Sequence, residues 1–425
     1  MKDVTCVCAK RVVSVVVILL AAAVAAPGSG FRNPPEDAQA LGRPGGKIAI
    51  VENATAVEHN PANLMYLEGV EAEVGATFVY AKSDFNSVLG FSETTENNLK
   101  VLPALYFGLP LGEEGRFAAG FGLSVPFGQS TEWSESGSMR YLAPYLAELS
   151  VVNLNPSFAA KLGDKILIGI GADLYSSTFN MQQVYPWSAV VGAPVRDGEA
   201  EIESTGEGLG GNIGVTWEIT KSQRLAATYR SAVTVDYDGD FRVDNIPADQ
   251  IPAALSFIRS SSSFGTEITF PAIAALGYAF KVGESLWLEA DVEWIEFSQY
   301  DTLKFDAGRD TALLPQTEYV QDWDDSWTFG FGADWGVTKA VTLRAGYMFI
   351  ESPIPDETLA PTLPDADRHV LSVGAGYTHG KHTFDVGYAY SIFDERDIDV
   401  NVNPAYVGSY DLSSQLFNLS YTYTF

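Results

Sequence analysis

Cysteine, positive charge and long apolar stretches are all scarce in this chain of 425 residues. The two cysteines, Cys6 and Cys8, stand before an apolar run from Arg11 to Ala26, so removal of that run leaves no disulfide framework. Lysine and arginine total 26 against 54 acidic residues, and the net charge of −28 argues against nucleic acid, whose phosphates require a basic surface. No later stretch is long enough for an apolar transmembrane helix, so any membrane crossing must be made of strands.

The N-terminus has the three parts of a secretory signal peptide. Lys10 and Arg11 form a basic start, the run RVVSVVVILLAAAVAA follows, and small residues end it. A membrane anchor is the alternative, but the run is short against the roughly 20 residues of a spanning helix. We therefore expect a signal peptide over residues 1–28, with cleavage between Ala26 and Gly30.

The chain is rich in two-residue alternation. In residues 326–336, SWTFGFGADWG, bulky apolar side chains alternate with small or polar ones. Successive side chains of a strand point to opposite faces, so one face carries aromatics and the other glycine, threonine and a carboxylate. The same alternation recurs in residues 285–297 and 382–390 and at the C-terminus. These stretches run about ten residues or more, the length with which a tilted strand crosses a bilayer.

About fourteen such segments can be counted, and the loops between them alternate in length. The predicted strands begin near Val70, Asn98, Arg116, Pro144, Lys165, Gly208, Arg224, Thr266, Ser285, Asp325, Val341, Arg368, His382 and Ser414. Short turns separate them at one end, and long loops near 82–97, 181–207, 242–265, 306–324, 353–367 and 399–413 separate them at the other. This rhythm is typical of an outer-membrane barrel with both chain ends on the periplasmic side.

The prediction is an all-β transmembrane antiparallel β-barrel of about 14 strands over residues 70–425. A soluble sandwich or propeller is the alternative, but its strands usually run about five or six residues. In hydrocarbon an unpaired N–H or C=O costs several kcal/mol, so the sheet must close on itself.

Residues 29–69 do not alternate and have no place in the wall. A disordered tail would be richer in charge and poorer in apolar residues, whereas this segment has an IAIV patch at 48–51 and further apolar positions to bury. We expect it to be a plug, or hatch, inside the lumen.

Several motifs of this chain resemble the FadL family, the outer-membrane transporters of long-chain fatty acids and aromatic hydrocarbons. The matching pieces, in order along nearly the whole mature chain, are Gly30-Phe31, Ala40-Leu41-Gly42-Arg43, Asn60-Pro61-Ala62-Asn63-Leu64, LNPSFAAKL (154–162), YRS (229–231), EWIEFSQYDTL (293–303) and the stretch from Arg344 to Tyr377. The resemblance implies a hatch whose rearrangement opens a passage, and a kinked third strand that opens laterally toward lipid.

Two motifs are the candidate gates. Asn60-Pro61-Ala62 is predicted to be a turn, because Pro61 fixes its own φ and restricts the residue before it. The structural interpretation is a turn that joins the hatch to the wall. The resemblance implies in addition that this turn belongs to a hatch that moves to open a passage. Pro126-Phe127-Gly128 lies late in the third predicted strand, where a proline cannot donate to a ladder and a glycine marks a bulge or a close approach. A bulge at the rim and a lateral opening are both compatible with it.

Ligand-binding candidates are few because basic residues are few. A fatty-acid carboxylate needs one or two cations in an apolar pocket, and Arg368 is the best candidate, with an ion pair to Asp365 or Asp367 as its alternative role. Phe31 is the second candidate. Aromatic residues of the long loops, Tyr185 and Trp187 or Phe257 and Phe264, are candidates for an outer collecting groove. Phe425 at the C-terminus resembles the assembly signal of outer-membrane barrels.

No residues suggest catalysis, a cofactor or a metal, so we expect no enzyme and no catalytic set. The expected function is passive transport of long-chain fatty acids or other hydrophobic compounds by a monomer in the bacterial outer membrane. Its expected partners are that cargo, membrane lipid and the barrel-assembly machinery, with no nucleic acid. A general diffusion porin for small polar solutes and a structural or adhesive barrel are the alternatives.

Overall fold

The computed structural model describes residues 29–112, 115–251, 260–308, 314 and 317–425. The predicted signal peptide, residues 1–28, and Phe257 lie outside the described residues. No helix among the described residues is long and apolar enough to cross a membrane.

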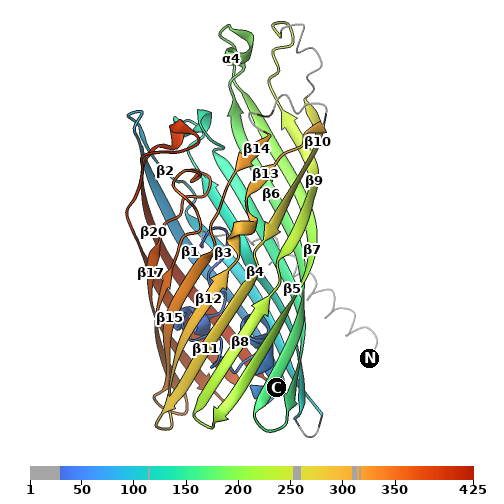
Figure 1. Ribbon diagram of the computed structural model, residues 1–425, viewed down its shortest axis with the longest axis vertical. Helices are drawn as coiled ribbons and strands as arrows, with labels where there is room; N and C mark the ends of the chain where they lie inside the picture. Colours follow the sequence, from blue (N-terminus) through green and yellow to red (C-terminus); the bar gives the residue numbers. More distant parts are fainter. Residues whose placement is uncertain (1–28, 113–114, 252–259, 309–313, 315–316) are drawn as a thin grey trace.

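The chain forms a closed antiparallel barrel of 14 strands, because the last strand pairs with the first along its whole length (Figure 1). The wall strands are β1 (Glu71–Ser87), β3 (Leu99–Leu111), β4 (Phe117–Glu132), β5 (Leu146–Leu162), β6 (Ile166–Tyr185), β7 (Gly198–Thr220), β8 with β9 (Gln223–Arg230 and Val233–Val243), β10 with β11 (Ser261–Phe270 and Ile273–Val282), β12 (Leu286–Ile295), β15 (Ser326–Gly336), β16 (Val341–Ile350), β17 (Arg368–His379), β18 (His382–Phe393) and β20 (Gly408–Thr424). Two wall strands are therefore each broken into two pieces, a feature the alternation did not predict.

Short helices and strands lie at the long-loop end of the barrel. They are β2 (Ser92–Thr94), η2 (Met139–Tyr141), α4 (Trp187–Val191), η4 (Phe297–Gln299), the hairpin of β13 (Thr302–Lys304) and β14 (Glu318–Val320), β19 (Arg396–Ile398) and η6 (Pro404–Tyr406).

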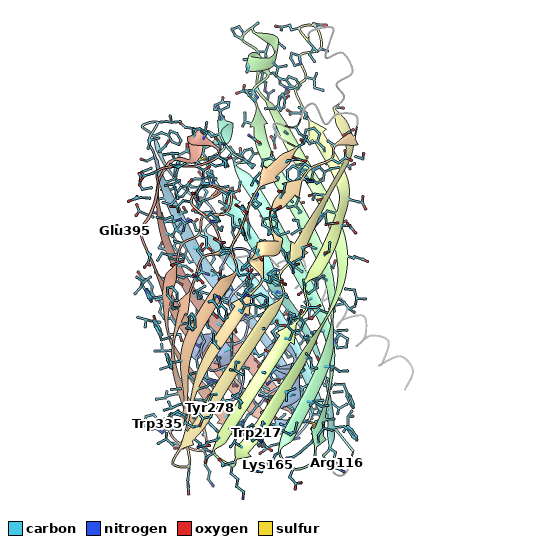
Figure 2. The ribbon with its side chains drawn as sticks, in the orientation of Figure 1. Arg116, Lys165, Trp217, Tyr278, Trp335 and Glu395 are labelled. Atoms are coloured by element: carbon cyan, nitrogen blue, oxygen red, sulfur yellow. The ribbon has the colours of Figure 1, made fainter. Side chains whose placement is uncertain are left out.

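The outer face of the wall is apolar. Trp327, Phe329, Phe331 and Trp335 are 43–63% exposed, whereas Thr328 between them is buried. Figure 2 shows Trp217, Tyr278 and Trp335 in one band above the short turns that carry Arg116 and Lys165, while Glu395 lies toward the long-loop end. Aromatic bands of this kind mark the membrane interface of a barrel. The predicted division into a lipid face and a luminal face is confirmed.

Most predicted strand starts lie within two residues of the observed ones, but three strands begin earlier than predicted. β7 starts at Gly198 rather than Gly208, β10 at Ser261 rather than Thr266, and β20 at Gly408 rather than Ser414. The predicted loop 181–207 is therefore mostly strand. The outward side chains of this part of β7 are Glu199, Glu201 and Glu203, so the backbone pairing continues where the apolar alternation has stopped.

The strands β6, β7, β9 and β10 rise well above the rest of the barrel and carry α4 at their tip (Figure 1). Their inner faces are apolar and pack against the β13–β14 hairpin in one large cluster, which includes Phe179, Ile202, Phe241, Phe264 and Phe305. We refer to this projecting part of the barrel as the arm. Its outward side chains on β7 and β9 are mostly acidic, in contrast to its apolar inner face.

The N-terminal segment, residues 29–69, lies inside the barrel (dark blue in Figure 1). It contains α2 (Ala38–Gly42), α3 (Ala56–His59) and η1 (Pro61–Tyr66). Helix α2 contacts β16, β17, β18 and β20, while η1 contacts β3 to β7 on the other side of the lumen. Ile48, Ile50, Val57 and Leu64 are at most 5% exposed, so these apolar side chains of the segment are buried.

Candidate functional site

A row of inward carboxylate side chains on β12 binds the N-terminal segment in the lumen. One carboxylate, that of Glu289, accepts hydrogen bonds from three consecutive backbone N–H groups of the segment, at 3.0 Å from Ile48, 2.5 Å from Ala49 and 2.8 Å from Ile50. The next inward residue, Asp291, accepts from the backbone N–H of Lys47 at 3.1 Å. These carboxylates take up donors that a chain without regular structure would otherwise leave unpaired in a buried place.

Further ion pairs fasten the segment to the wall on several sides. Glu293 pairs with Arg32 and, at 2.7 Å, with Lys47 Nζ, so it joins two distant parts of the segment. Arg224 of β8 lies 2.6 Å from Glu52. The alternation of residues 285–297 predicted which β12 residues share a face, but it gave no sign that the polar face binds the segment.

The Asn60-Pro61-Ala62 turn is docked in a recess of the β6–β7 wall. Asn60 is fully buried, and its side-chain N–H groups donate to Ile48 O at 2.9 Å and to Thr216 Oγ1 at 2.9 Å. Its side-chain oxygen caps η1 by accepting from Ala62 N at 3.1 Å. A Cβ added at Gly214 would collide with the Asn60 side chain, so the turn approaches the wall only because glycine stands there.

The wall is interrupted between β3 and β4. Their ladder runs from Leu111 and Phe117 at the short-turn end to Leu105 and Leu123, and it stops there. Above that point β4 continues to pair with β5, with a register shift between Ser124 and Phe127. We refer to the unpaired stretch, residues 99–104 of β3 against 124–131 of β4, as the wall gap. It closes again at the long-loop end, where Glu96 N donates to Glu132 O at 2.7 Å.

At the gap, β4 is buried on both faces although it still pairs with β5. From Val125 to Thr131 every residue except Pro126 is buried, where a wall strand would alternate between buried and exposed residues. Val125 packs in a luminal cluster with Leu102 of β3 and Leu416 of β20. The register shift and the unbroken burial coincide with Pro126-Phe127-Gly128, and we refer to this irregular stretch of β4 as the kink.

The N-terminal segment pairs with the kink of β4. Asn33 N donates to Pro126 O at 2.9 Å, and Gly128 N donates to Phe31 O at 2.7 Å. Val125 N donates to the Glu36 carboxylate, with 2.7 and 2.8 Å to its two oxygens. The backbone groups that β4 loses in the wall thus find partners in the segment, as buried backbone groups must.

Phe31 is enclosed by aromatic rings. The centroids of Phe270, Phe297, Tyr300 and Trp323 lie 5.2–5.5 Å from that of Phe31, and Phe127 of the kink lies at 6.2 Å. We refer to these neighbours as the aromatic cage. Most of the contacts are edge-to-face, the arrangement that aromatic rings prefer. The ring of Phe31 occupies the cage.

Arg368 is buried and paired, as its alternative role predicted. Its Nη1 lies 3.1 Å from Asp365 Oδ1, and the other oxygen of Asp365 accepts from Gly30 N at 3.0 Å. Burial raises the pKa of Asp365, and Arg368 and the Gly30 N–H oppose that rise. One carboxylate therefore joins Arg368 to the residue that precedes Phe31.

A cavity of about 150 Å³ occupies the lumen beside these groups. The kink, the N-terminal segment and inward residues of β16 to β20 line it, and Met348, Val370 and Leu416 supply apolar surface. Arg368 lines it together with two arginines that no sequence motif marked as ligand-binding residues, Arg32 and Arg230. Arg230 pairs with the buried Asp173 and with Glu58 of the segment, so all three guanidinium groups already have carboxylate partners.

The other predicted residues are placed as follows. Trp187 and Phe264 are buried in the apolar cluster of the arm and do not line an open groove, so the predicted collecting groove is wrong for these two residues. They are buried because the strands continue past the membrane and need a core of their own. Phe425 is 63% exposed, and its N–H donates to Val70 O at 2.8 Å at the closing seam of the barrel.

A closed barrel with an apolar outer band, a filled lumen and a gap in its wall defines a transport protein of the outer membrane. The chain matches the family model described as outer membrane protein transport protein (OMPP1/FadL/TodX) over residues 19–425. The chain belongs to this family.

Curated relatives match over nearly their full length. The long-chain fatty acid transport protein of Salmonella typhi is 24% identical, covering 93% of this chain and 94% of its own. The 47 kDa outer membrane protein of Pasteurella multocida is 25% identical, covering 88% and 90% respectively.

Solved structures share the fold. A Pseudomonas aeruginosa FadL homologue superposes with a TM-score of 0.80 at 20% identity, covering 93% of this chain and all of that one. The Ralstonia pickettii toluene transporter TbuX gives a TM-score of 0.70 at 17% identity, covering 93% and 99%.

Proposed function

We propose that this protein carries hydrophobic molecules passively across the outer membrane and releases them sideways into the lipid. Long-chain fatty acids are the first candidate cargo and aromatic hydrocarbons the second, in line with the names of the Salmonella typhi relative and the Ralstonia pickettii transporter. In this proposal residues 1–28 are a cleaved signal peptide, residues 29–69 a hatch, and residues 70–425 the barrel of a monomer without enzymatic activity.

One observation carries the proposal: the N-terminal segment contacts the wall on both sides of the lumen, whereas the ladder between β3 and β4 has a gap beside the cavity. The N-terminal segment contacts strands on both sides of the lumen, and its apolar side chains are buried. The cavity is lined by Pro126 and Phe127 of the kink. A greasy molecule that leaves through the wall gap enters hydrocarbon directly and avoids the water below, which favours this route by the hydrophobic effect.

Phe31 and Arg368 are the proposed ligand-binding residues. A cargo ring or chain replaces the Phe31 ring in the aromatic cage, and a cargo carboxylate replaces Asp365 on Arg368. Both exchanges release the segment at neighbouring residues, because Asp365 also holds Gly30. Release of residues 29–36 frees the kink of β4, and further movement of the hatch about Asn60-Pro61-Ala62 widens the passage.

The test is a double variant that straightens β4, Pro126→Thr with Gly128→Val. Both new residues favour strand and allow β4 to rejoin β3. We expect uptake of oleate and toluene into vesicles to fall to the protein-free rate while the barrel still folds and inserts. Pro110→Thr is the matched control, since Pro110 lies in the intact ladder of β3 with β4. Uptake by the double variant at the wild-type rate would refute lateral release.

Single-channel conductance separates transport of this kind from a diffusion porin. A porin needs an open aqueous lumen and gives large steady currents in planar bilayers. We expect wild-type protein to give small or no steady currents, because the N-terminal segment fills the lumen.

A further inference from the structure

A second, smaller cavity of about 30 Å³ lies beside the wall gap, toward the long-loop end. Lys100 of β3, Ser83 of β1 and Ser130 of β4 line it. The smaller cavity shares Arg368 and Phe393 with the larger luminal cavity, so these two residues stand between the lumen and the gap.

Two polar groups at this cavity have no partner. Lys100 is only 7% exposed, yet its ammonium group makes no hydrogen bond or ion pair with any residue that the structure describes. The hydroxyl oxygen of Ser83 is fully buried and also unpaired. Buried charges in proteins are normally paired, and buried hydroxyls are normally hydrogen-bonded. The cavity therefore offers one cation and one donor to a group that comes from outside the chain.

The carboxylates nearest to Lys100 are engaged elsewhere. Glu132 and Glu148 act on Lys100 electrostatically, but Glu132 accepts from Asn97 Nδ2 at 2.5 Å and Glu148 accepts from Ser130 Oγ at 3.2 Å. Glu96 also lines the cavity. Because these carboxylates repel negative charge, a small anion binds in the cavity with little favourable free energy. The occupant must therefore contribute apolar contacts as well. Phe393 and Leu412, which line the cavity, supply the apolar surface for an acyl chain.

We propose that Lys100 and Ser83 form a binding station for one anionic headgroup, a carboxylate or a phosphate, whose acyl chain lies beside the wall gap against Phe393 and Leu412. The inference rests on the proposed route through the gap and extends it by naming the chemical class that the gap selects. An amphiphile with a negative headgroup binds there, and an uncharged hydrocarbon passes without the contact.

The first test measures equilibrium binding of radiolabelled oleate and oleyl alcohol to the full-length protein in neutral detergent. We expect Lys100→Met to weaken oleate binding about tenfold, the loss of one charge-assisted contact, and to leave oleyl alcohol binding within about twofold. Lys100→Arg keeps the charge and should retain oleate binding. The control is Lys161→Met, which removes a lysine paired with Glu218 at the short-turn end. An equal loss for both probes overturns the proposal, and so does unchanged oleate binding together with unchanged lipid A retention in the second test.

The second test separates two sources of the headgroup, the cargo and the membrane. Native mass spectrometry counts the lipid A molecules, which carry phosphates, that wild-type protein and Lys100→Met retain. Loss of oleate binding with lipid A unchanged assigns the station to the cargo, and loss of lipid A with oleate unchanged assigns it to the surrounding lipid. If neither changes, the station does not exist. Failure of the wild-type protein to speed uptake of any oleyl probe contradicts the proposed transport instead, and it leaves the binding results to decide on Lys100.

Discussion

Replacing Glu289 with glutamine is expected to loosen the N-terminal segment without unfolding the barrel. Glu289 is 3% exposed and accepts three backbone N–H groups, from residues 48, 49 and 50. A hydrogen bond to a charged group contributes about 1.5–3 kcal/mol. Glutamine keeps one acceptor oxygen for Ile48 and Ala49 at reduced strength, and it turns an N–H group toward the N–H of Ile50. The expected loss is about 3 kcal/mol, or roughly a hundredfold increase in local opening.

The assay is amide hydrogen exchange of residues 47–50 followed by mass spectrometry, which reports local opening directly. The wall strands should keep their protection, because their ladders do not include Glu289 side-chain bonds. Glu207→Gln is the control, since Glu207 is an exposed outward residue of β7. Equal exchange of residues 47–50 in Glu289→Gln and wild type would show that the carboxylate does not anchor the segment.

Two further predictions concern the contact between the segment and the kink. Burial and the nearby Glu58 raise the pKa of Glu36 well above its ordinary value, so docking of residues 29–36 is strongest at low pH and weakens as pH rises through that raised pKa. Proteolysis of the N-terminus should therefore increase with pH in wild type and not in Glu36→Gln, which mimics the protonated carboxyl; the same pH dependence in both proteins contradicts this. Phe31→Ala empties the aromatic cage at a cost of about 3–5 kcal/mol in docking, and toluene should bind the vacant cage more tightly than it binds wild type. Calorimetric titration with toluene checks this, and equal affinity in the two proteins rejects the cage as a ring site.

On the luminal face, the sequence predicted which side chains share a face but not which residues they contact. The alternation in residues 285–297 placed Glu289, Asp291 and Glu293 on one face, and the structure confirms that they point inward. Their partners lie some 240 residues away in sequence, and no pattern in either segment indicates that they meet. Lys100 was not singled out, because its buried position beside the wall gap depends on contacts between distant segments.

The sequence by itself determined the class of fold. Each strand has lipid on one face and a lumen of small and polar side chains on the other, so its sequence alternates with a period of two. The sheet must also close, because hydrocarbon offers no hydrogen-bond partner to an open edge. These are local constraints, so they are written along each strand. The sequence also shows Pro126 close to Gly128 in the third strand, a combination that marks a bulge or a close approach.

Only the tertiary structure decided what the interruption does. The gap exists because β4 exchanges its partner in the wall for residues 31–36, a choice between two long-range pairings that lie far apart in the chain. The length of the arm was also decided only by the tertiary structure. Beyond the membrane the outward side chains no longer need to be apolar, so the alternation stops before the strands end. Where each face of a strand has a known environment, lipid or lumen, the periodicity of the sequence is sufficient to predict the strand. Where the burial of a residue depends on which distant segments meet, its role is seen only in the folded chain.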